Sequence, residues 1–86
     1  MDSTLLEVPI PADALPETVL RMRVVAARKV AMLTQAEMGR LIGRHHNIPA
    51  IPQHTIWHWE KTGNIPAIYL GAIAAACGVE FDFFRI

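Results

Sequence analysis

Apolar residues recur at helical spacing over most of the chain, with turn-forming residues between the resulting segments. Leu20, Val24, Ala27 and Ala31 lie three or four positions apart in a region rich in helix-forming residues, which begins with a proline and a glutamate. Proline fits the first position of a helix, and glutamate suits its positive end. The pattern predicts a first helix over about residues 16–32.

A capping signal marks the start of the next helix. Thr34 and Glu37 have the spacing of a capping box, in which the hydroxyl and the carboxylate each accept a hydrogen bond from the other residue's amide. The second helix therefore begins at Thr34. We expect it to continue to about His46, because Pro49 restricts the residue before it to extended conformations.

Two further helices follow, each opened by a proline. Pro52 begins a third helix, in which Ile56 and Trp59 lie on one face. Pro66 begins a fourth and strongly apolar helix, and Gly78 supplies the left-handed residue that ends it.

Both ends of the chain have the character of strands. The segment 80–86, EFDFFRI, is aromatic and lacks a helix signal, and Leu5–Ile10 is similarly extended. We expect a mainly α fold of four helices with short terminal β-strands. It divides into an extended arm (1–15), a helical domain (16–79) and a C-terminal strand (80–86).

Composition limits the chain to one small domain with an uneven charge distribution. It has 86 residues, 52% hydrophobic and 19% charged, with a formal net charge of zero. Residues 18–79 nevertheless carry seven basic and two acidic residues, while both ends are acidic. This asymmetry favours an anionic partner for the centre of the chain, although chance sorting of solvated charges gives the same pattern.

The lone cysteine and the N-terminal sequence indicate a reducing compartment. Cys77 has no partner for an intramolecular disulfide, and no secretory pattern opens the chain, so we expect a cytoplasmic protein. Ile65–Val79 is free of charge but is shorter than the roughly 20 residues that span a bilayer. We interpret it as a buried helix and expect no membrane partner.

Several motifs occur in an order that resembles the lambda repressor and Cro type of helix-turn-helix DNA-binding proteins. They are LTQAEMGRLIG at 33–43, TIWHWEKTGNIP at 55–66 and ACGV at 76–79. The resemblance covers about residues 20–79, and its most specific elements are Thr34 with Gln35, Ile56 and Trp59 followed by Glu60, and Pro66 six positions later.

The resemblance implies that the start of the third helix contacts base edges. The family's base-reading positions fall on Gln53, His54, Thr55 and His58. Glutamine can bond adenine through two hydrogen bonds, neutral histidine can donate or accept, and the threonine methyl can contact a thymine methyl.

Other positions fit contacts to the DNA backbone. The family uses the residue matching Gln35 to hold a phosphate, and Arg40, Arg44, Lys61 and the backbone near Asn64 are placed to do the same. The alternative for each is a solvated side chain that contacts only water.

The resemblance also implies a structural ion pair between Arg28 and Glu60. The sequence departs from the family pattern in Arg44–Ala50, RHHNIPA, which has the character of a seven-residue insertion before the third helix. It either follows a phosphate backbone or packs beside the domain. Gly63 also follows Glu60 by three residues where two are more usual in the family, so the turn after the third helix can differ in geometry from the family's.

Specific binding to a duplex normally needs two such domains, one turn of DNA apart. We expect a homodimer in which the C-terminal strand pairs with its symmetry mate or with the N-terminal strand and buries Phe81, Phe83 and Phe84. The alternative is an intramolecular ribbon that covers the core.

No set of nucleophile, base and orienting group is apparent, so we expect neither an enzyme nor a cofactor. A metal site built from His54 and His58 with His45 or His46 has no fixed acidic or cysteine ligand nearby, and we expect none.

The hypothesis is a homodimeric repressor that binds double-stranded DNA at a palindromic operator close to its own gene. The competing interpretation is a protein-interaction module, such as an antitoxin, that binds a toxin or another partner through Trp57 and the aromatic tail. Trp57 could instead pack on the insertion. The polar residues at the start of the third helix favour DNA.

Overall fold

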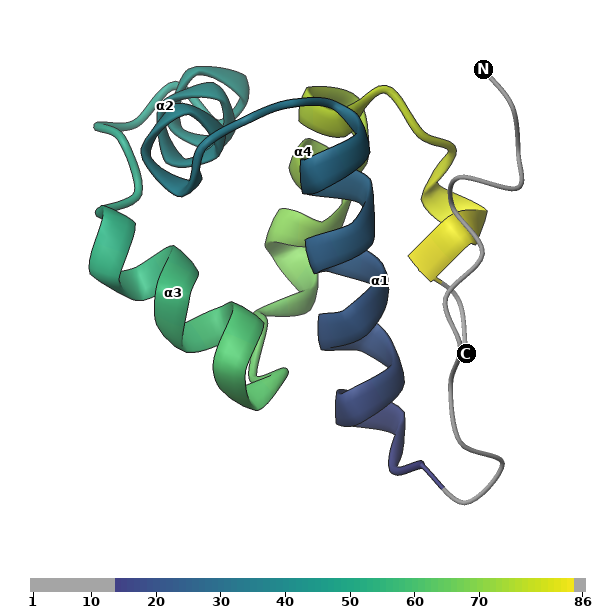
Figure 1. The fold of residues 1–86 in the computed structure, drawn as a ribbon. Coiled ribbons are helices and arrows are strands. Elements are labelled where there is room, and N and C mark those ends of the chain that lie inside the picture. Colours follow the sequence, from purple (N-terminus) through teal and green to yellow (C-terminus); the bar gives the residue numbers. More distant parts are fainter. Residues whose placement is uncertain (1–13, 85–86) are drawn as a thin grey trace.

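The computed structural model describes residues 14–84, and every regular element in this range is helical. Four α-helices and two 3₁₀ helices form a compact globule (Figure 1). They are α1 (Pro16–Val30), α2 (Gln35–His45), α3 (Gln53–Thr62), η2 (Ala67–Tyr69), α4 (Leu70–Cys77) and η3 (Phe81–Phe84). The prediction of four helices is confirmed.

The junction between α1 and α2 follows from local signals. The Thr34 hydroxyl accepts a hydrogen bond from the Glu37 amide at 3.0 Å, and the Glu37 carboxylate accepts one from the Thr34 amide at 2.9 Å. The capping box is thus confirmed, and these hydrogen bonds lower the pKa of Glu37. α1 ends two residues before the predicted bound because Met32 has a φ of 60° and turns the chain back.

One hydrophobic core joins all four helices. Its largest fully buried side chains are Val24 of α1, Met38 and Ile42 of α2, Ile56 of α3 and Ile73 of α4. The helical spacing in the sequence brings each of these residues to the inner face of its helix. α4 ends at Gly78, whose φ is 70°, as its sequence predicts.

The prediction of a C-terminal strand is wrong. Residues 81–84 form the 3₁₀ helix η3, and the ring of Phe84 is buried in the chain's own core. η3 lies against α1 on the side away from α3 (Figure 1), where Arg23 of α1 donates a hydrogen bond to the Phe83 carbonyl at 3.4 Å. A strand needs a paired neighbour, and none is present within residues 14–84, whereas a helical turn places Phe84 in the core. The predicted strand at Leu5–Ile10 lies outside the described residues.

The connection between α2 and α3 is held to α2 through backbone atoms. The Ile51 amide donates to the Gly39 carbonyl at 3.0 Å, and the Ile48 amide donates to the Gly43 carbonyl at 2.9 Å. A Cβ atom added at Gly39 would lie 2.1 Å from the Ile51 carbonyl oxygen, and one at Gly43 would lie 2.7 Å from that of Pro49. The two glycines therefore admit the connection against the helix.

The fit of the connection against α2 gives a test with a matched control. Gly39→Ala should lower the free energy of unfolding by about 2 kcal/mol, because the new methyl group overlaps backbone that cannot rotate away. Gly71→Ala in α4 should raise it by about 0.5 kcal/mol, since nothing lies within 4 Å of the added atom and alanine favours the helix. Urea unfolding of both variants measures the difference. Equal stabilities would contradict the packing described.

Candidate nucleic-acid interface

α3 has one face in the core and one face open to solvent. Ile56 is fully buried, and Trp59 and Glu60 are buried beside it. The opposite side carries the exposed residues His54, Trp57, His58 and Lys61, which are spaced as i, i+3, i+4 and i+7. We call these four residues the outer face of α3. Their exposure leaves one side of the helix available to a partner.

The four predicted base-reading residues all lie in the first two turns of α3. Gln53 is the first residue of the helix and is exposed, as are His54 and His58, while Thr55 is half-buried at the edge of the outer face. Pro52 stands at the N-cap without a side-chain hydrogen bond, so no capping side chain covers the first amides. The arrangement places hydrogen-bonding groups around an uncovered helix end.

Trp57 belongs to this surface, although the sequence analysis assigned it to the competing function. Its side chain is 51% exposed, and the ammonium of Lys61 lies 4.7 Å from the ring centroid in a cation–π contact. Helical spacing in the sequence already places Trp57 on this face, between His54 and Lys61. Trp57 thus stands among the polar residues of the same face.

The predicted phosphate-binding residues do not share one environment. Arg40 and Arg44 are exposed one turn apart on α2, Lys61 is exposed on α3, and Asn64 is exposed just after it. Gln35 differs, because its amide is half-buried and donates to the Glu60 carboxylate at 3.1 Å. The four exposed residues are free to meet solvent anions, whereas the Gln35 amide already has a partner.

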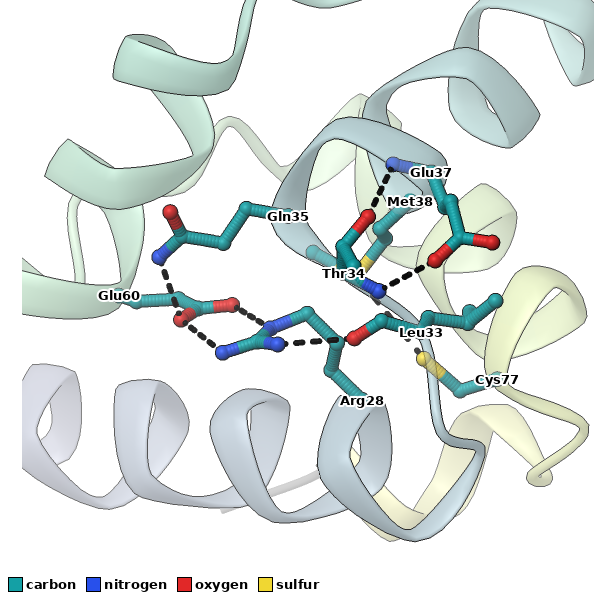
Figure 2. A network of polar contacts seen from close by, with 8 residues as sticks. All are labelled: Arg28, Leu33, Thr34, Gln35, Glu37, Met38, Glu60 and Cys77. Carbon is teal, nitrogen blue, oxygen red and sulfur yellow. Dashed lines mark hydrogen bonds and ion pairs between the residues drawn. The ribbon is translucent and has the colours of Figure 1, made fainter.

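A polar network holds α3 to the helices behind it (Figure 2). Arg28 of α1 donates to both carboxylate oxygens of Glu60, from Nε at 2.5 Å and from Nη2 at 2.9 Å. Its remaining nitrogen, Nη1, donates to the Leu33 carbonyl at 2.9 Å. With Gln35 added from α2, the network joins three helices and the turn between the first two. The link through Gln35 and Leu33 was not predicted, because no spacing rule connects residues of three different helices.

Three aromatic rings pack together between the C-terminus of α2 and the inner face of α3. The ring of His46, which caps α2, lies edge-on to Tyr69 at 5.0 Å, and Tyr69 lies 5.4 Å from the ring of Trp59. The chain of rings connects the C-terminus of α2 to the inner face of α3. Of the two alternatives for the insertion, these contacts correspond to packing beside the domain, while Arg44 and His45 stay exposed. α2 ends at His45, so seven residues connect it to α3.

Cys77 is a free cysteine buried in the core. Burial raises the pKa of the Cys77 thiol to about 11, and its sulfur lies 3.9 Å from that of Met38 in the core. Among the described side chains, no group of three or more histidines, cysteines or carboxylates could hold a metal ion. None of the helices described is both long and apolar enough to cross a membrane.

Comparisons with protein-family models, with curated proteins and with solved structures found no match to this chain. The function therefore has to be argued from the chain's own residues and their arrangement.

The network around Glu60 gives a second test. Glu60→Ala should lower the free energy of unfolding by about 3 kcal/mol, because it leaves the guanidinium of Arg28, whose side chain is only 13% exposed, without its carboxylate. Arg40→Ala, at an exposed position, should change stability by less than about 0.5 kcal/mol. Chemical denaturation of the two variants provides the measurement. A loss below about 1 kcal/mol for Glu60→Ala would show that the network does not hold α3 in place.

Proposed function

We propose that this chain is a sequence-specific DNA-binding regulator of the lambda repressor and Cro type, and that it acts as a homodimeric repressor at a palindromic operator. Its action is occupancy of a site rather than catalysis. The support comes from the placement of α3, from the residues on its outer face and from the charges beside it.

The observation that carries the proposal is the contrast between the two sides of α3. The inner side is fixed to the core by Ile56, Trp59 and the buried Glu60. The first turn and the outer face are exposed and carry hydrogen-bonding and aromatic groups. An α-helix presented in this way fits the width of the major groove, where its N-terminal residues can contact base edges.

The exposed basic residues of α2 and α3 suit a polyanion. Arg40, Arg44 and Lys61 are exposed on α2 and α3. The two acidic residues of these helices already have partners, since Glu60 is paired with Arg28 and Glu37 caps α2. Arg44 borders a hollow between α2 and α4, lined also by Leu41 and Ala72. Basic side chains that reach the duplex would neutralise phosphates and release counterions.

The 3₁₀ helix η3 limits which aromatic residues of the C-terminal segment could contact a second copy. Phe84 is buried in the chain's own core and Phe83 is half-buried against it, so a second copy could not cover both rings in full. Phe81 remains 52% exposed. We therefore place any contact of the C-terminal segment with a second copy at Phe81.

A second candidate function is a protein-interaction module that binds a partner such as a toxin. The exposure of Trp57 and Phe81 favours it, because exposed aromatic side chains are common anchors of protein interfaces. The polar first turn of α3 does not add to such an interface, so DNA binding remains the stronger proposal.

The decisive experiment is selection of duplexes from a random pool by the purified protein. The expected result is one enriched motif with two-fold symmetry, whose half-sites lie about 34 Å apart along the duplex. A pool without enrichment would contradict the proposal and favour the protein-interaction module.

Gln53 should contribute to sequence preference. Gln53→Ala should reduce the difference in binding free energy between the selected duplex and a random duplex by about 1–3 kcal/mol, the value of a two-bond contact to a base. Competition binding at fixed salt measures this ratio. An unchanged ratio would remove Gln53 from the set of base-reading residues.

Arg44 should contribute to affinity without sequence preference. Arg44→Ala should weaken binding to all duplexes alike and reduce the slope of log affinity against log salt by about one. Arg21→Ala serves as the control, because Arg21 lies on α1 outside the proposed interface. A slope equal to that of the parent would show that Arg44 does not contact phosphate.

A further inference from the structure

A shallow hollow lies on the outer side of α3. It is lined by His54, Thr55, Trp57 and His58, and its lining is predominantly apolar although each of these residues also carries a polar group. All four come from the first turns of the helix, next to the uncapped N-terminus. The hollow is therefore part of the surface that would enter the groove.

Trp57 forms one wall of this hollow. A tryptophan that is 51% exposed leaves much apolar surface in water, which costs free energy unless a partner covers it. Its contact with the Lys61 ammonium restricts the ring before any partner arrives. A wall held in this way loses little conformational entropy on binding.

The surroundings of the hollow limit what can occupy it. Hydrogen-bonding groups of His54, Thr55 and His58 line it, and the ammonium of Lys61 lies over the ring of Trp57. No acidic residue lies among the outer-face residues of α3. The matching occupant is a small apolar group on the edge of a planar, polar molecule that belongs to a polyanion.

Bases present one such group in the major groove. Their edges there carry hydrogen-bond donors and acceptors, and the apolar exception is the methyl group at C5 of thymine. A methylated cytosine presents the same methyl group at the same ring position.

We infer that the hollow accepts the 5-methyl group of a pyrimidine, with Trp57 as a specificity-determining wall. The inference rests on the proposed DNA-binding function and goes beyond it, because it assigns a role to a residue outside the four proposed base-reading positions. Discrimination at this site depends on apolar contact rather than on a hydrogen bond.

The test uses the operator obtained by selection, with each thymine replaced in turn by uracil. This change removes the methyl group and leaves the hydrogen-bonding edge intact. At one position in each half-site, the affinity should fall about fourfold, the factor for returning one methyl-sized apolar group to water. In a second arm, each cytosine is replaced by 5-methylcytosine, and an affinity gain of similar size would identify methylcytosine as the source.

A variant links the effect to Trp57. In Trp57→Ala, the affinity difference between thymine and uracil should disappear at that position. Ile68→Ala is the matched control, since it truncates another exposed apolar side chain, 70% exposed on η2, and should keep the difference. The two arms on the unaltered protein need no variant, so the test stands even if Trp57→Ala does not fold.

The outcomes separate the inference from the function on which it rests. A selected operator whose affinity changes in neither arm would overturn the methyl site and leave sequence-specific binding intact. A methyl effect that persists in Trp57→Ala would overturn the role of Trp57. Failure to select any motif would overturn the proposed function together with the inference.

Discussion

The position of α3 depends on the pairing of Arg28 with Glu60. A carboxylate with little access to water is costly unless its oxygens are satisfied, and both oxygens of Glu60 accept hydrogen bonds from one guanidinium. The rotation of α3 that brings Glu60 to Arg28 also buries Ile56 and Trp59. The same constraint turns the opposite face outward, so the availability of His54 and Trp57 follows from how the helix is held.

Local signals in the sequence were sufficient for most of the helical framework. The Thr34 and Glu37 capping box, Pro52 before α3 and Gly78 at the end of α4 each act within a few residues, and their effects can be deduced without knowing the fold. Pro66 precedes the 3₁₀ helix η2, and α4 begins only at Leu70, four residues later than predicted. The positions of Ile56 and Trp59 on the inner face follow from helical spacing in the same way.

The errors arose where distant parts of the chain decide the structure. The EFDFFRI segment has the composition of a strand, but Phe84 gains more from burial between α1 and α4 than from extended backbone that has no described neighbour to pair with. The phosphate contact of Gln35 stays a prediction, but local signals did not reveal the partner that its amide has within the chain. Its contact with Glu60, twenty-five residues away, depends on how α2 and α3 meet. The role of Gly39 was equally hidden, since only the folded connection shows which backbone comes close.

The connection between α2 and α3 is attached to α2 through its main chain. This attachment separates the surface that the connection presents to solvent from the position of α3. Asn47 has a φ of 56°, which few residue types adopt readily, but the side chains of Ile48 and Ala50 are exposed, and the contacts that hold the connection to α2 come from the main chain of residues 48–51. Substitutions at Ile48 or Ala50 could alter the charge or shape presented at this edge of the molecule without moving the helix. In evolutionary terms, the exposed positions of this loop can acquire new contacts through substitution while the helical framework is retained.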